Sequence, residues 1–158
     1  YFPNSNLSMK GELKKAMVTY YDFITGYENL LRDGGEFYGA TVSSMDGKMT
    51  INQWPPVRNQ IATVGKRFDN RDVIHFLNYT NAVHLDWCDS NGTQAAPSLI
   101  ESAQTKINVK GTAKSVWVAS PDASFGVSRK LDFTQDGNEI KVTLPSLSYW
   151  TMLVVEYE

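Results

Sequence analysis

Two carboxylates near the start of the chain are of the residue types that cleave glycosidic bonds, because glycosidases use a pair of Asp or Glu side chains. Asp22 and Glu28 lie six residues apart, on the charged side of a predicted helix. A helix face in contact with water explains both carboxylates. The sequence therefore predicts no catalytic residue in this segment.

A second group of reactive side chains lies in the sequence HLDWC. His84, Asp86 and Cys88 occupy alternate positions, so on a strand they would share one face and could bind zinc. A zinc site would need further ligands, and the other histidine, His75, lies in a run typical of a core. Cys88 is also a weak candidate nucleophile, because no basic partner can be assigned to it. The oxygen-rich segment 86–93 lacks the spacing of a calcium loop and is explained by turn residues. We expect no metal site and no cofactor.

The four tryptophans are candidates for sugar binding, because a flat aromatic ring offers a large apolar surface with defined stacking geometry. Trp117 and Trp150 lie in apolar runs that are typical of a core. Trp54 stands beside two prolines and Trp87 beside a polar loop, so both are expected at the surface. Trp54 and Trp87 are therefore the candidate substrate-binding tryptophans.

The first element that must position these residues is a helix predicted over residues 8–32. Its apolar residues recur in steps of three and four and form one broad stripe. They are Leu13, Ala16, Met17, Tyr20, Phe23, Ile24, Tyr27, Leu30 and Leu31. Ser8 can cap the start, and the RDGG sequence at residues 32–35 is a strong stop. So wide a stripe requires a large partner surface, since a lone helix is marginal in water.

From about residue 37 the hydrophobic period changes to the two-residue period of strands. Hairpins are predicted over residues 38–54, 60–80 and 129–145, the first and last with Asp-Gly turns. Further strands are predicted at residues 82–88, 104–111, 114–120 and 149–158. The predicted fold is mainly β, an antiparallel Greek-key β-sandwich preceded by one amphipathic α-helix.

Length and charge exclude several classes of partner. The chain has 158 residues, of which 42% are hydrophobic and 20% charged, as in an ordinary globular domain. Its formal net charge of −2 and the absence of a basic run give no support for binding nucleic acid or an anionic membrane. No apolar stretch approaches the roughly 20 residues that span a bilayer. The single cysteine excludes an internal disulfide.

Four segments of the sequence together carry a resemblance to a known family. They are YFPN at the start, YYDFITGYENLLRDGG in the helix, IATVGKRFDNRDVIHFLNYTN in a hairpin, and the closing LPSLSYWTMLVVEYE. Together they resemble the C-terminal end of glycoside hydrolase family 66, and the resemblance covers nearly the whole chain. That family holds endo-dextranases and cycloisomaltooligosaccharide glucanotransferases, which act on α-1,6-linked glucan with retention at the anomeric carbon.

The resemblance implies a division of the chain into parts of two domains. Members of the family have an immunoglobulin-like domain, a (β/α)₈ barrel and a C-terminal β domain. Residues 1–35 would be the last loop and helix of the catalytic barrel, and residues 36–158 the C-terminal β-sandwich. The apolar stripe of the helix would then pack on the missing barrel. The family's catalytic Asp and Glu lie on earlier barrel strands, so no catalytic residue is carried over.

The resemblance also suggests where sugar could be contacted. Tyr1, Phe2 and Asn4 would lie on a loop at the carboxyl end of a barrel strand, where such barrels form their active sites. Packing at the barrel rim is the alternative role for these residues. Secretion is implied as well, because dextran is too large to enter a cell.

The expected function is that of a non-catalytic C-terminal region that packs on a dextran-active barrel and stabilises it. The expected partners are that barrel and its α-1,6-glucan substrate. Three alternatives remain open at this point. The chain could be a stand-alone carbohydrate-binding module, the C-terminal sandwich of another α-glucan-active hydrolase family, or an interaction module that self-associates through its helix.

Overall fold

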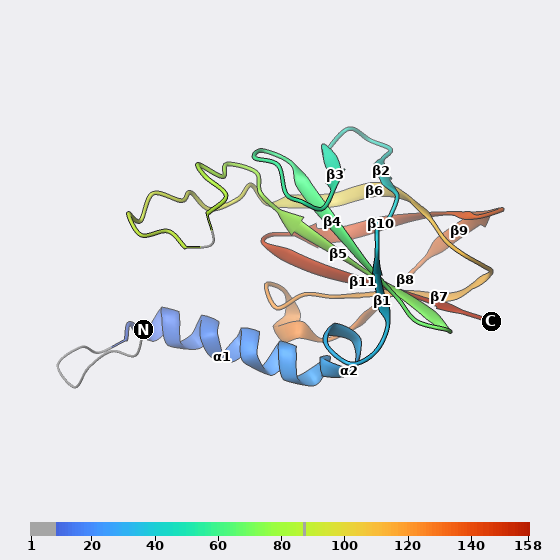
Figure 1. Ribbon diagram of the computed structural model, residues 1–158, viewed down its shortest axis with the longest axis horizontal. Helices are drawn as coiled ribbons and strands as arrows, with labels where there is room; N and C mark the ends of the chain where they lie inside the picture. The colour runs from blue at the N-terminus through green and yellow to red at the C-terminus, as the bar shows by residue number, and fades with distance from the viewer. Residues whose placement is uncertain (1–8, 87) are drawn as a thin grey trace.

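Residues 9–86 and 88–158 are described by the structure, a computed structural model in which a helix lies along one side of a β-sandwich (Figure 1). The helical part has two elements, α1 (Gly11–Gly26) and α2 (Glu28–Leu31). The predicted helix is thus confirmed but is interrupted at Tyr27. Gly34 and Gly35 follow with φ of 60° and 70°, which is the left-handed conformation expected after a helix. Ser8, the expected cap, lies outside the described residues.

The strands form two sheets that pack face to face. The larger sheet has the order β1-β4-β5-β11-β7-β8, and β3 and β1 follow one another along the same edge of β4. Its strands are β1 (Glu36–Tyr38), β3 (Ile51–Gln53), β4 (Ile61–Arg67), β5 (Arg71–Asn78), β7 (Ala113–Ala119), β8 (Arg129–Leu131) and β11 (Trp150–Tyr157). The smaller sheet has the order β2-β6-β10-β9. Its strands are β2 (Val42–Ser44), β6 (Ile100–Asn108), β9 (Phe133–Asp136) and β10 (Glu139–Leu147).

The predicted fold class is confirmed, because the described strands pair antiparallel everywhere except between β3 and β4. Two of the predicted hairpins are present, β4–β5 and β9–β10. Gly137 turns the second hairpin with a φ of 55°. The closing strand β11 lies between β5 and β7, which are both distant from it in sequence.

Two predictions about strands are wrong. Residues 38–54 do not form a hairpin, because β2 pairs with β6 in the smaller sheet while β3 pairs with β4 in the larger one. The turn at Gly47 exists, with a φ of 71°, but it sends the chain from one sheet to the other. The strand predicted at residues 82–88 is also absent from the described residues there, which belong to a long loop between β5 and β6.

The main core lies between the two sheets and is complete without the helices. The residues buried in it include Ile61, Ile74, Phe76, Ile107, Val116, Ile140, Leu144 and Leu153. Each such side chain contributes about 1.5–3 kcal/mol by leaving water. The sandwich therefore has its own source of stability, and α1 is an addition to it.

A buried carboxylate ties together the ends of four strands of the larger sheet, β1, β4, β5 and β11. Asp72 is fully buried and accepts two hydrogen bonds from Arg67, at 2.9 Å and 2.7 Å. The hydroxyls of Tyr38 and Tyr157 donate to the same carboxylate, at 3.2 Å and 2.8 Å. Burial, together with the charge of Asp72, raises the pKa of both tyrosines, so they remain donors. These three partner side chains donate four hydrogen bonds to Asp72, which fits a role in stability.

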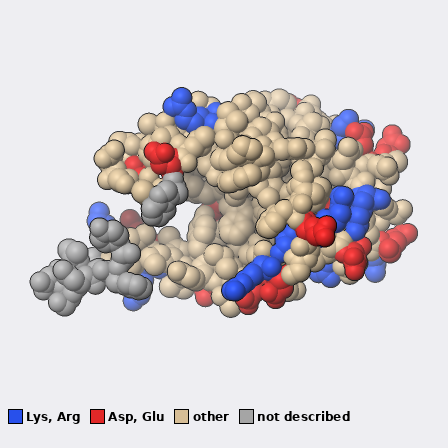
Figure 2. Space-filling model, viewed as in Figure 1, with Lys and Arg blue, Asp and Glu red and all other residues tan. Residues whose placement is uncertain are grey.

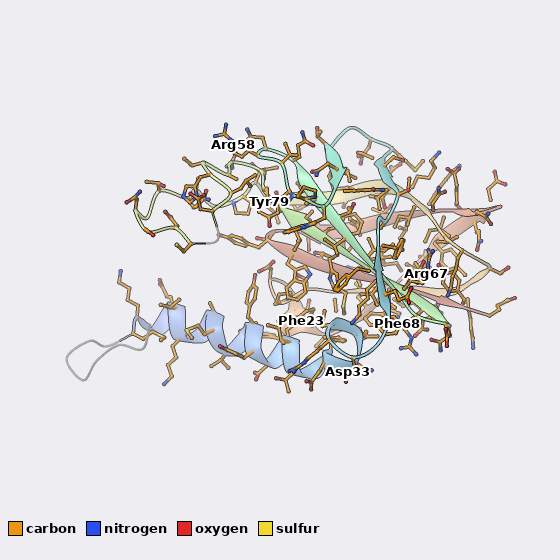
Figure 3. The ribbon with its side chains drawn as sticks, viewed as in Figure 1. Phe23, Asp33, Arg58, Arg67, Phe68 and Tyr79 are labelled. Atoms are coloured by element: carbon orange, nitrogen blue, oxygen red, sulfur yellow. The ribbon has the colours of Figure 1, made fainter. Side chains whose placement is uncertain are left out.

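Helix α1 docks with its C-terminal half on the outer face of the larger sheet. Phe23, labelled in Figure 3, is 3% exposed. The centre of its ring lies 4.9 Å from the ring centres of Tyr27 and Trp150. The Tyr27 hydroxyl donates a 2.8 Å hydrogen bond to the carbonyl of Gly126. The side of the helix that carries Phe23 thus packs on the sandwich, contrary to the expectation that the whole stripe faces a missing barrel.

Candidate functional site

Helix α1 has a second apolar side, which remains exposed. This uncovered stripe consists of Leu13, Met17, Val18, Tyr21 and Ile24, with exposed fractions of 54%, 39%, 52%, 65% and 46%. Ile24 follows Phe23 by one residue and therefore lies about 100° further around the helix. The apolar part of α1 is consequently wider than the sandwich can cover, and one flank is left in solvent.

Shallow grooves run along this stripe. One of about 360 Å³ is lined by Ala16, Met17, Tyr20, Tyr21 and Ile24, and its walls are almost entirely apolar. Charged side chains on the face in view gather mainly over the part of the sandwich near the C-terminus, away from the start of α1 (Figure 2). The lining of this 360 Å³ groove includes no charged side chain, so its chemistry suits a protein surface.

The edge of the stripe is fastened to the sandwich by Asp122, in the loop after β7. Its carboxylate accepts the Tyr20 hydroxyl and the backbone N–H groups of Tyr149 and Trp150, the latter two at 2.9 Å and 2.7 Å. Burial and the bond to Asp122 raise the pKa of Tyr20, so this hydroxyl stays a donor. The contact fixes the rotation of α1 and so determines which flank faces solvent.

A second candidate site is a groove of about 580 Å³ on the larger sheet, at the edge formed by β1 and β3. Phe37 and Trp54 flank it with exposed fractions of 74% and 55%, and Gln53 and Val64 contribute to its walls. The structure therefore places Trp54 at the surface, as expected. Two exposed aromatic rings beside an amide can bind the apolar face and the hydroxyls of a sugar. Trp87, the other candidate tryptophan, lies outside the described residues.

The two tryptophans expected in the core are half-buried beneath α1. Trp117 and Trp150 pack against the cluster around Phe23 on the outer face of the larger sheet. The indole N–H of Trp150 donates to Nδ1 of His75 at 3.1 Å. Burial, with a smaller effect of Lys66, lowers the pKa of His75 to about 4. His75 is therefore neutral at pH 7 and serves as a hydrogen-bond acceptor.

His84, Asp86 and Asp89 belong to a hydrogen-bonded loop. His84 lies 3.3 Å from Asp86 and 3.5 Å from Asp89, and the Asp89 carboxylate also accepts the backbone N–H groups of Thr93 and Gln94. These bonds lower the pKa of Asp89 to about 2. Within residues 9–86 and 88–158, no group of three or more His, Cys, Asp or Glu side chains could hold a metal ion.

The carboxylates considered first stay on the solvent side of the helices. Asp22 is exposed, and exposed Glu28 lies 3.9 Å from Arg32 in an i, i+4 pair. Both carboxylates thus have the exposure expected of a charged helix face. In the part of the chain that is described, no helix is long and apolar enough to cross a membrane.

Comparison with known proteins identifies the family to which the chain belongs. The family model of glycosyl hydrolase family 66 matches residues 1–154. The chain belongs to this family. A cycloisomaltooligosaccharide glucanotransferase from Niallia circulans is 32% identical over 99% of this family 66 chain, which spans 16% of that protein. A dextranase from Streptococcus salivarius is 24% identical over 99% of the chain, which spans 21% of that protein.

A solved structure shares the same architecture. It is a Paenibacillus cycloisomaltooligosaccharide glucanotransferase complexed with cycloisomaltoheptaose, with a TM-score of 0.84 and 32% identity over 98% of this chain and 22% of that one. The family 66 chain is thus a small part of the enzymes that it resembles. The resemblance read from the sequence is confirmed. Tyr1, Phe2 and Asn4, the expected sugar contacts, lie outside the described residues.

Proposed function

We propose that this chain is the non-catalytic C-terminal region of a secreted, retaining enzyme that acts on α-1,6-glucan, and that it packs on the catalytic barrel and stabilises it. The uncovered stripe of α1 carries the proposal, because an apolar helix flank of this size beside a complete sandwich core requires a further partner. This chain covers only 16–22% of the length of its relatives, which leaves room for such a partner in the same polypeptide.

In this proposal residues 1–35 are the last loop and helix of the barrel, and residues 36–158 are the C-terminal domain. Helix α1 then belongs to both, with the Phe23 side on the larger sheet and the uncovered stripe on the barrel. Tyr1, Phe2 and Asn4 would reach the rim of the barrel, where glucan binds. Glucan of this size is degraded outside the cell, which is the basis for proposing secretion.

The test uses the intact enzyme, meaning this chain joined to the polypeptide that precedes it in the parent. Tyr21→Ser should accelerate thermal inactivation of dextran-degrading activity, because it removes an aromatic ring from the stripe. Met45→Ser is the matched control, since Met45 is 47% exposed beside the smaller sheet, on the opposite side from α1. Dextran-degrading activity in the chain alone, or equal inactivation of both variants, would contradict the proposal.

A second function is favoured by the groove beside Trp54, which would bind glucan at the surface of the sandwich. Titration of the chain with isomalto-oligosaccharides should then change its tryptophan fluorescence, and Trp54→Ala should abolish the change. Phe37→Ala removes the opposite wall and should weaken binding without removing the fluorophore. An unchanged signal at millimolar sugar would exclude this groove as a binding site.

A further inference from the structure

The loop between β7 and β8 contains three consecutive residues in the left-handed region. Ser124, Phe125 and Gly126 have φ of 50°, 53° and 77°. Only glycine adopts this region without a steric penalty, and two neighbouring L-residues there are rare. Strain of this kind persists where the surrounding structure enforces it, and it concentrates at functional sites.

Phe23 of α1 and Tyr27, the residue that follows α1, help to hold this conformation. The carbonyl of Gly126 accepts the Tyr27 hydroxyl at 2.8 Å, and a Cβ at Gly126 would lie 2.8 Å from the ring of Phe23. Within the turn, the N–H of Gly126 donates to Ala123 at 3.1 Å, and the N–H of Val127 donates to Ser124 at 3.1 Å. The turn is therefore held between its own hydrogen bonds and the docked side of the helix.

The turn exposes the aromatic ring of Phe125 to solvent. Phe125 is 83% exposed, the largest exposed fraction among the large hydrophobic side chains of the described residues, and Val127 is 67% exposed. Phe125 gains almost nothing from burial within this chain. The strained backbone thus presents an apolar side chain that the sandwich itself does not use.

The turn lies on the flank of α1 that borders the uncovered stripe. Asp122, two residues before the turn, accepts the hydroxyl of Tyr20, and Tyr20 also lines the groove that runs along the stripe. The loop after β7 comes up against α1 in Figure 1. Stripe and turn therefore present apolar side chains on adjoining elements.

We infer that Phe125 is an anchor residue that inserts into the catalytic region of the parent enzyme, beside the stripe of α1. The inference rests on the proposed function and adds to it a contact outside residues 1–35. The occupant is the preceding polypeptide of the proposed function, because the relatives are about five to six times longer than this chain. Exposed aromatic rings on rigid supports are the usual anchors of such interfaces.

Thiol footprinting tests the contact without disturbing the fold. In a Cys88→Ser background, Phe125→Cys, Tyr21→Cys and Met45→Cys are each labelled with a maleimide, in the chain alone and in the intact enzyme. Labelling of Phe125→Cys and Tyr21→Cys should be at least about tenfold slower in the intact enzyme, because burial blocks access to the thiolate. Met45→Cys, on the opposite side of the sandwich, should react at the same rate in both.

The outcomes separate the two proposals. Protection of Tyr21→Cys without protection of Phe125→Cys would overturn the anchor and leave the proposed function intact. Protection of neither would overturn both. Protection of Phe125→Cys in the chain alone, growing with protein concentration, would mean that a second copy of this chain is the occupant and would also overturn the anchor.

Discussion

Replacing Phe23 by alanine should undo the docking of α1 on the sandwich. The side chain is 3% exposed and packs between Tyr27 and Trp150, at 4.9 Å from each ring. Truncating a buried phenylalanine costs about 3–5 kcal/mol, and alanine returns about 0.5 kcal/mol through its better helix propensity. The free energy of unfolding of the chain should therefore fall by about 3 kcal/mol.

Urea denaturation provides the assay, followed by circular dichroism for α1 and by tryptophan fluorescence for the neighbourhood of Trp150. Ile24→Ala is the matched control, because Ile24 is the next residue on the same helix and is 46% exposed. Its effect should stay below about 1 kcal/mol. Equal effects of the two substitutions, or a loss below about 1 kcal/mol for Phe23→Ala, would refute the division of α1 into a docked and an uncovered side.

Three further predictions concern the sandwich and its contact with α1. Asp72→Asn should lower the free energy of unfolding by about 1.5–3 kcal/mol, because it replaces the buried carboxylate that accepts hydrogen bonds from Arg67 by a neutral amide, whereas Lys106→Ala at an exposed ion pair should cost at most about 1 kcal/mol in the same denaturation assay. His75 has a pKa of about 4 in the folded chain against 6.5 as a free side chain, so the unfolded chain takes up the proton first as the pH falls. Stability should then drop by roughly 3 kcal/mol from pH 6.5 to pH 4, and His75→Gln should flatten that part of a pH series. Gly126→Ala should lower the melting temperature by several degrees, since it adds a Cβ at a φ of 77° and against Phe23, and an unchanged melting temperature would contradict the enforced turn.

Local signals in the sequence predicted those elements whose partners are close along the chain. The β4–β5 and β9–β10 hairpins were predictable because each pairs two strands across a short turn. The amphipathic period predicted the helical segment that contains α1 and α2, and the glycines at residues 34–35 predicted its end. The proline-flanked position of Trp54 correctly indicated exposure.

The errors came where contacts outside the local segment decide the structure. The turn at residues 46–47 predicts a hairpin by every local rule, yet Val42 pairs with Ile107 and Ile51 pairs with Ile61. The alternation in residues 82–88 likewise predicts a strand, but the bonds of Asp89 to Thr93 and Gln94 help to hold a loop instead. Local propensity is a weak constraint when pairing across the sheet decides the outcome.

The sequence by itself determined the fold class and the membership in family 66, because periodicity, turn chemistry and characteristic motifs are all properties of short segments. Only the tertiary structure decided which side of α1 is docked and which is free. A helical period shows that a stripe is apolar, but it does not show how much of the stripe a neighbouring sheet can cover. The same is true of Phe125, whose exposure depends on a turn held by Phe23 and Tyr27 from about 100 residues away.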